Sequence, residues 1–319
     1  LASILVRQDR ADDAEASIKA AIADRPEQTG LRLALANFFE QTGRAAEAVT
    51  VYEGVAALEP RSNDGLAARN RIASLTVDGD EAYARQVVEG ILLDAPDNSD
   101  ALLLRAALRI GDNQIDEAIG DLRLVLVKRP ASVRALLGLA RAQLLNGNGS
   151  LAEEAYRQVL AIDPANASAS RELAVLVGNR GDTDEAEKLL RQALRIEPGN
   201  PDASRNLVRA LMIQQDVEAA EAEARRMVSE GQAAGVAKFQ LGRALEAQQD
   251  LDGAAEAYRA SLEEVPSAEA PLTSLARLLV NSGRDAEAEA LLAEQIAAYP
   301  DQLRAKYLLA EVYAKQGKL

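Results

Sequence analysis

The side chains of this chain that could do chemistry are carboxylates and arginines, because its 319 residues include neither Cys nor His. Without Cys there is no disulfide, thiolate metal site or thiol nucleophile. Without His the usual zinc ligand and general base are also missing. Lys and Arg number 36 against 50 Asp and Glu, which gives a formal net charge of −14. So acidic a chain argues against nucleic-acid binding, which needs a basic surface.

Two local motifs suggest chemistry but fit structural roles better. Gly147 to Ala152 read GNGSLA and match a dinucleotide fingerprint, but that fingerprint needs a strand before it. The acidic residues around Asp78 and Asp182 do not fit a calcium loop and are expected to cap helices. No P-loop, G-x-S-x-G or H-E-x-x-H motif is present, and no apolar run is long enough to cross a bilayer. The sequence therefore predicts no catalytic, cofactor or metal site.

The elements that position the remaining side chains follow a period of 34 residues. Eight prolines recur at this spacing, with one step of 36 and one step of two periods: Pro26, Pro60, Pro96, Pro130, Pro164, Pro198, Pro266 and Pro300. A series of nine alanines has no gap: Ala14, Ala48, Ala84, Ala118, Ala152, Ala186, Ala220, Ala254 and Ala288. Aromatic residues are only 3% of the chain. Short helices in close contact are the structure that this pattern favours.

The pattern resembles the tetratricopeptide repeat (TPR) family, whose unit is a 34-residue pair of helices, A and B. Residues 133–164 and 167–198 carry it best, and the first of them has its small, turn, aromatic and closing positions at Ala140, Gly147, Ala152, Tyr156 and Pro164. The resemblance implies an all-α, right-handed α-solenoid. It also implies one superhelix over residues 1–319, with eight complete repeats and a partial repeat at each end.

Both ends of the sequence fall inside a repeat. Leu1 lies at position 7 of a helix A, and Leu319 comes just after the turn between helices A and B of a tenth repeat. Neither end carries a polar cap, so we expect a segment of a longer array. We also expect apolar surface at Leu308, Leu309, Val312 and Tyr313, because the next helix B is missing.

Two regions depart from the period. Between residues 61 and 113, two extra residues are expected between Pro60 and the next helix A. Arg71, Arg105 and Arg109 fall at positions that are usually apolar or small. A local register shift with a longer turn around Gly111 explains this, and a kink or partner-specific patch is the alternative. Gln232 stands where a proline is missing and marks a second joint between Gly231 and Gly235, whose simpler explanation is a glycine that ends a helix.

The resemblance places positions 5 and 9 of each helix A on the concave face. In repeats five to nine, six of these ten residues are arginines and none is acidic. We therefore expect a partner-binding groove formed by Arg141, Arg171, Arg205, Arg209, Phe239, Arg243 and Arg277, with Arg69, Asn70 and Asn206 beside it. Arg suits carboxylates because its planar fork donates two hydrogen bonds, and the amides could bind a peptide backbone.

Each of these residues also has a structural explanation. The arginines could pair with neighbouring carboxylates, as Arg243 could with Glu246, and the sequence leaves this open. Phe239 could anchor a partner or be partly buried within its repeat.

The function that follows is a non-catalytic scaffold that binds an acidic peptide or a partner helix. The alternative is a bacterial cell-envelope module in polysaccharide export or protein sorting, which would contact an anionic glycan or a secretion partner. An enzymatic role would require a catalytic domain outside this segment. The absence of Cys favours the envelope, but the sequence leaves the cytoplasm and the periplasm both open.

Overall fold

The computed structural model describes residues 11–317 of the chain. Within that range it contains eighteen α-helices and no strand, which confirms an all-α solenoid of helix–turn–helix repeats. Leu1 and Leu319 lie outside the described residues, so the partial repeats expected there are not described at those ends. None of the described helices is both long enough and apolar enough to span a bilayer.

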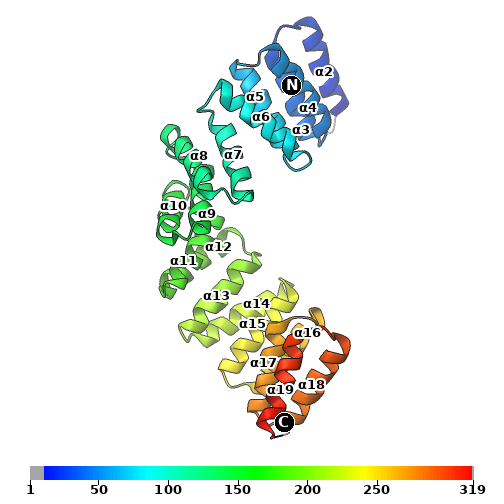
Figure 1. Ribbon diagram of the computed structural model, residues 1–319, viewed down its shortest axis with the longest axis vertical. Helices are drawn as coiled ribbons and strands as arrows, with labels where there is room; N and C mark the ends of the chain where they lie inside the picture. The colour runs from blue at the N-terminus through cyan, green and yellow to red at the C-terminus, as the bar shows by residue number, and fades with distance from the viewer. Residues whose placement is uncertain (1–10, 318–319) are drawn as a thin grey trace. The chain divides into compact units, whose positions relative to one another are not determined.

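The chain divides into two compact units, residues 1–158 and 159–319, and α10 (Gly149–Ile162) contains the boundary (Figure 1). In unit 1 the helices A are α3 (Thr29–Gln41), α5 (Asn63–Thr76), α7 (Ser99–Gly111) and α9 (Val133–Leu145). Its helices B are α2 (Ala11–Asp24), α4 (Ala45–Leu58), α6 (Glu81–Asp94) and α8 (Ile115–Lys128). The expectation of one continuous superhelix stays a prediction.

Unit 2 repeats this alternation. Its helices A are α11 (Ala167–Asn179), α13 (Pro201–Ile213), α15 (Ala234–Ala247), α17 (Glu269–Asn281) and α19 (Leu303–Lys315). Its helices B are α12 (Thr183–Ile196), α14 (Val217–Ser229), α16 (Leu251–Glu264) and α18 (Asp285–Ala298).

Small residues bring the two helices of each repeat together. All nine members of the alanine series are buried, with at most 2% of their surface exposed, so the expected burial of Ala152 and Ala186 is confirmed. Several helix starts, including those of α6 and α12, are capped by side chains as the sequence indicates. The Asp182 side chain accepts a hydrogen bond from the Glu185 N–H at 3.1 Å, and Asn200 caps α13 by accepting from Ala203 N–H at 3.0 Å. These caps satisfy backbone donors that the helix itself leaves free.

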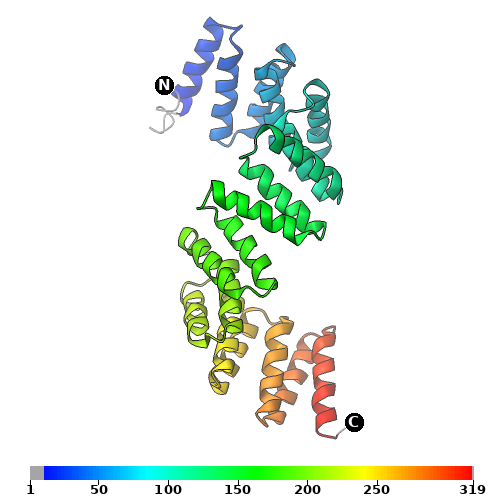
Figure 2. The same ribbon diagram turned by 90° about the vertical axis from the view of Figure 1, so that its left-hand side faces the viewer.

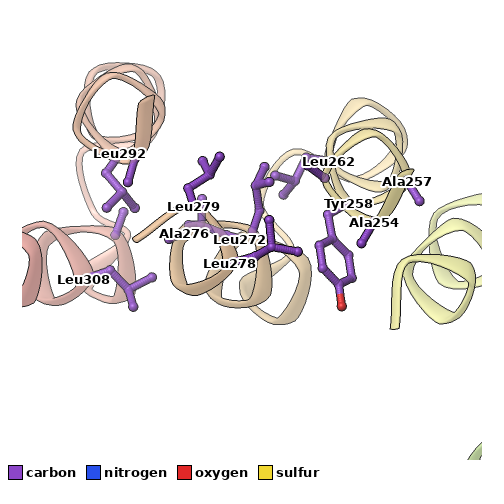
Figure 3. Close-up of a cluster of buried hydrophobic side chains, with 14 of the residues drawn as sticks. Ala254, Ala257, Tyr258, Leu262, Leu272, Ala276, Leu278, Leu279, Leu292 and Leu308 are labelled. Atoms are coloured by element: carbon purple, nitrogen blue, oxygen red, sulfur yellow. The ribbon is translucent and has the colours of Figure 1, made fainter. Parts of the chain in front are cut away.

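Within each unit, helices that follow one another in the chain pack together, and several helices A also contact the next helix A. Figure 2 shows this for α17, α18 and α19, which lie side by side in orange to red. Their apolar side chains form a continuous core with those of α16. Figure 3 shows Tyr258 in this core, with its hydroxyl oxygen at the edge of the cluster. The helices therefore bury their apolar faces only when repeats stack.

The expected position of the two extra residues near Pro60 is wrong. Helix α5 begins at Asn63, three residues after Pro60, and α7 likewise begins at Ser99, three residues after Pro96. The extra length lies at the other end, because α5 has 14 residues and four residues separate it from α6. Arg71 is therefore the ninth residue of its helix and does not occupy the usually apolar position that the sequence predicted for it.

The longer turn expected around Gly111 is also absent, since only residues 112–114 separate α7 from α8. Arg105 and Arg109 are instead explained by Asp121 of α8, whose side chain is buried. Arg105 Nη2 lies 2.8 Å from Asp121 Oδ1, and Arg109 Nη1 lies 2.6 Å from Oδ2. A buried carboxylate needs such partners, so these arginines belong to the packing of the repeat.

The apolar surface expected on α19 differs from the prediction. Leu308 and Val312 are only 2% and 4% exposed, because they pack into the core of α17 and α18. Leu309 and Tyr313 are half-buried. The exposed apolar residues of this helix are instead Leu303 and Tyr307.

Gly231 ends the repeat before the second joint. Its φ of +67° lies in the left-handed region, and α14 ends two residues earlier at Ser229. This agrees with the simpler explanation of a glycine that ends a helix. Gln232 is buried, and its side-chain amide donates to the Pro198 carbonyl at 3.4 Å.

Candidate partner-binding surface

Three arginines recur at the same position of consecutive helices A in unit 2. Arg209 of α13, Arg243 of α15 and Arg277 of α17 are each 34 residues apart, and we call them the arginine ladder. Arg209 and Arg277 are exposed and Arg243 is half-buried. Within residues 11–317, none of the three forms an ion pair with Asp or Glu.

Neutral amides orient two members of the ladder. Arg209 Nη2 donates to Asn179 Oδ1 at 3.5 Å, and Arg243 Nη1 donates to Gln240 Oε1 at 3.2 Å. An amide oxygen limits the rotation of a guanidinium group without cancelling its charge. The ladder is therefore a row of positive charges that keep donors available.

The position-5 arginines of the same unit differ from the ladder. Arg171 Nη2 lies 3.0 Å from Glu172 Oε1, and Arg205 Nη2 lies 2.9 Å from Asp202 Oδ1. Each is thus paired with an acid of its own helix, which agrees with the structural explanation that the arginines pair with neighbouring carboxylates. Such solvent-accessible pairs add little stability, but they reduce the local positive charge.

Phe239 is half-buried and packs within its own repeat. Its ring centroid lies 5.7 Å from that of Tyr258, at an interplanar angle of 40°. The Tyr258 hydroxyl donates to Glu246 Oε2 at 2.6 Å, and burial together with this hydrogen bond raises the pKa of Tyr258. Glu246 therefore serves Tyr258, and the pairing with Arg243 that the sequence suggested is not formed.

Each end of the ladder adjoins a small depression. At Arg209 it has a volume of about 260 Å³ between α11 and α13, and Asn179 and Asn206 contribute to its lining. The Asn206 side-chain amide makes no hydrogen bond to any described residue. At Arg277 the depression is about 130 Å³, and Glu311 lines it without forming an ion pair with Arg277. Both depressions have the size of one side chain rather than of a helix.

The inner residues expected in unit 1 have different surroundings. Arg69 Nη1 lies 2.7 Å from Asp94 Oδ2 and donates to the Pro60 carbonyl at 3.1 Å. The Arg69 hydrogen bond lowers the pKa of Asp94. Arg69 is therefore part of an internal ion pair rather than a free donor, in contrast to its expected role. Asn70 donates to Asn98 Oδ1 at 3.1 Å. Arg141 is exposed and has no ion-pair partner among residues 11–317.

Unit 1 has its own inner cavity, of about 380 Å³, which the sequence analysis missed. Its lining includes Asn37, Arg71, Ser74 and Arg134, together with Asn70. Arg71 forms an ion pair with Glu40, which also accepts from the Tyr52 hydroxyl at 2.5 Å. Burial raises the pKa of Glu40, but the hydrogen bonds from Arg71 and Tyr52 outweigh this effect and lower it.

A sequence signal for these residues existed. Asn37 and Arg71 are both the ninth residues of their helices. The displaced start assigned to α5 concealed this equivalence. Among the described residues, no three His, Cys, Asp or Glu side chains gather in a way that could hold a metal ion.

Comparisons with known proteins agree with the geometry. Two family models described as tetratricopeptide repeat match the chain, one at residues 1–63 and 102–167 and the other at 179–240 and 245–312. Together they cover most of the sequence. The chain belongs to the tetratricopeptide repeat family. A search among curated proteins found no match.

Solved TPR-like structures show the same fold at low identity. A chain of the APC/C hetero-tetramer Cut9–Hcn1 has a TM-score of 0.54 and 16% identity over 96% of this chain, which spans 59% of that chain. PilF of Pseudomonas aeruginosa has a TM-score of 0.53 and 19% identity, covering 67% of this chain and 97% of PilF. A tetratricopeptide repeat protein from Parabacteroides merdae has a TM-score of 0.52 and 17% identity, covering 74% and 92%.

Membership of the TPR family supports a general role for this chain. Proteins of this family are protein–protein interaction scaffolds that bind proteins or peptides, and they are generally non-catalytic. The inner residues of its helices A are therefore the natural place to look for the contacts that select a partner.

Proposed function

We propose that this chain is a non-catalytic scaffold that binds an acidic protein segment through the arginine ladder of unit 2. The observation that carries this proposal is the row of three arginines without carboxylate partners, in a chain whose net charge is −14. In the same unit Arg171 and Arg205 form ion pairs with acidic neighbours, whereas the three ladder residues form none among residues 11–317. A row that remains unpaired favours an anionic ligand from outside.

Each arginine of the ladder can form the same kind of bond. A guanidinium group binds a carboxylate through two parallel N–H···O bonds, and oriented groups lose less conformational entropy when they bind. Asn179 and Gln240 provide this orientation for Arg209 and Arg243. Arg141 of unit 1 has the same exposed character, and within its own unit it extends the set of free donors.

Binding of a fluorescent acidic peptide to the full chain tests the proposal. Replacing all three ladder residues with Gln keeps side-chain length and polarity but removes three positive charges. We expect the affinity to fall at least about tenfold, because each desolvated charged hydrogen bond contributes about 1.5–3 kcal/mol. The affinity of the unchanged protein should also decrease as salt increases from about 0.01 M to 0.15 M, since the Debye length falls from about 30 to 8 Å.

The matched control replaces three arginines on helices B: Arg191→Gln, Arg225→Gln and Arg259→Gln. All three are paired with glutamates, so the change in charge is equal while the ladder is intact. Equal weakening by the two triple variants would show only a general effect of charge and would contradict the proposal. Unfolding of the ladder variant would assign those arginines to packing instead.

The cell-envelope function makes a different prediction with the same protein. If the ligand is an anionic glycan, an oligogalacturonate should bind more tightly than any acidic peptide of equal charge. That result would replace the peptide ligand by a polysaccharide.

A further inference from the structure

We infer that the segment bound by the arginine ladder is a polyproline II (PPII) stretch with an acidic residue at every third position. This inference rests on the proposed function and adds the conformation and spacing of the ligand. It follows from the distance between rungs, from the free amides beside them and from the size of the adjoining depressions.

The spacing of the rungs comes from the packing of the helices that carry them. Consecutive ladder residues occupy the same position on α13, α15 and α17, which are consecutive helices A of one unit. Helices α13 and α15 contact each other directly, and α15 and α17 both pack on α16. Because packed helices lie about 8–10 Å apart, we expect a ligand that follows the ladder to meet one guanidinium about every 8–10 Å. Its acidic groups must repeat at that distance and point to one side.

A PPII chain meets both conditions at three-residue intervals. It has three residues per turn and rises about 3.1 Å per residue, so positions i, i+3 and i+6 share one face and lie about 9 Å apart. A β-strand places residues of one face about 6.6 Å apart. This distance is shorter than the spacing between neighbouring arginines, and twice this distance is longer than that spacing. An α-helix with acids at i and i+7 spans about 10.5 Å, so spacing alone does not exclude it.

The polar groups beside the ladder decide between PPII and a helix. A PPII chain leaves its backbone N–H and C=O groups free, whereas an α-helix uses them internally. The Asn206 amide has no partner among the described residues, and Asn179 uses only its oxygen toward Arg209. Free amides of this kind match the unsatisfied backbone of an extended ligand.

The shape of the surface agrees with this choice. The depressions beside Arg209 and Arg277, of about 260 and 130 Å³, can each accept a single side chain. A proline ring has this size, and a PPII segment of this kind has prolines next to each acidic residue in its sequence. A helix would instead need a continuous apolar trough along its whole length.

The test uses two seven-residue peptides of identical composition with blocked ends, EPPEPPE and EPEPEPP. Both contain three glutamates and four prolines, but only the first has glutamates at every third position. We expect EPPEPPE to bind the full chain at least about tenfold more tightly, which is the effect of gaining one charged hydrogen bond. An alanine-based helix with glutamates at seven-residue intervals and a trigalacturonate complete the set.

A double-mutant cycle locates the central contact. Changing the middle glutamate of EPPEPPE to glutamine should weaken binding to the unchanged protein. The same peptide change should hardly alter the affinity of the Arg243→Gln variant, because the bond between the two side chains is already lost there. Arg191→Gln, on a helix B, should leave the effect of the peptide change intact. Thermal midpoints of both variants should equal that of the unchanged protein.

The possible outcomes separate this inference from the function on which it rests. Equal binding of the two heptapeptides, with dependence on the ladder, would overturn the spacing but leave the acidic-peptide function standing. Tighter binding of the helix would overturn the PPII conformation alone. If no peptide binds, both proposals fail, and preference for trigalacturonate would assign the ladder to a glycan.

Discussion

Arg71 of unit 1 and Arg277 of unit 2 are both the ninth residues of their helices, and each follows a repeat with a tyrosine–glutamate hydrogen bond. In unit 1 Arg71 pairs with Glu40, the glutamate that accepts from Tyr52. In unit 2 Glu246 accepts from Tyr258, but Arg277 does not join them. The same sequence pattern thus gives a neutralised arginine in one unit and a free one in the other.

The difference teaches that residue type and position do not decide whether an arginine is available. In unit 1, Arg69, Arg105 and Arg109 are also held by carboxylates of the following helices B. In unit 2, by contrast, Arg209 and Arg243 of the ladder donate to neutral amides. We therefore expect charge changes in unit 1 to affect stability and charge changes in the ladder to affect binding.

The largest expected effect is on stability in unit 1. Asp121→Asn should lower its free energy of unfolding by about 2–4 kcal/mol, because it leaves Arg105 and Arg109 beside a neutral group in a buried site. Denaturant unfolding of the full chain measures this. The control is Asp202→Asn, which breaks the exposed pair with Arg205 and should change the unfolding midpoint very little. Similar losses for both variants would erase the distinction between the units.

Closing the ladder should abolish most binding. Met212 is the twelfth residue of α13, as Glu40 is of α3. Met212→Glu therefore places a carboxylate in the repeat before Arg243, as Glu40 lies in the repeat before Arg71. We expect it to pair with Arg243 and weaken acidic-peptide binding about tenfold. Met212→Gln is the matched neutral control and should bind normally. Unchanged binding by Met212→Glu would show that the two units differ for another reason.

The stability of unit 1 should also depend on acid pH through Glu40. Its pKa in the folded chain is lowered, so the unfolded chain takes up a proton first as the pH falls below about 4.3. The contribution of Glu40 is thus fully present above that pH and is lost as the pH falls through its folded pKa. We expect Glu40→Gln to cost about 1 kcal/mol at neutral pH, and its thermal midpoint should converge with that of the unchanged protein as the pH falls through the folded pKa of Glu40. Parallel midpoint curves would contradict this.

The smallest expected effect concerns the end of the ladder. Glu311 lines the depression beside Arg277. Its negative charge repels an incoming carboxylate, and dissolved salt weakens this repulsion. Glu311→Gln should therefore strengthen acidic-peptide binding about twofold, with a larger gain at low salt. Glu287→Gln removes an acid of α18 that pairs with Arg259 of α16 and with Arg284, the residue before α18, and is the comparison. A decrease in affinity would mean that Glu311 itself contacts the ligand.

Most of the fold could be predicted from the sequence because it depends on steric repetition. A buried alanine at each contact between helices A and B, and a proline after most helices B, leave a 34-residue mark that needs no knowledge of partners. The start of α5 was mispredicted because the two extra residues of this repeat were expected before the helix, near Gly65. They instead lengthen the helix and the turn that leads to Asp80.

The site was less predictable because ion pairing depends on groups far apart in sequence. Arg69 and Asp94 are 25 residues apart, and Arg105 and Asp121 are 16 apart. Nothing in the local pattern separates Arg205, which pairs with Asp202, from Arg209, which faces Asn179. The sequence shows that position 9 is often arginine, but it does not show which of these arginines lack a carboxylate partner.

The preference of each helix for its chain neighbours also governs how the protein folds. Few contacts join distant parts of the sequence, so contact order is low and the chain can nucleate in any repeat without closing long loops. Folding should then spread from one helix pair to the next. A ligand that spans α13, α15 and α17 would join three repeats that otherwise communicate only through their neighbours. Its binding should slow the fraying of those repeats together, while the helices of unit 1 continue to open at their own rates.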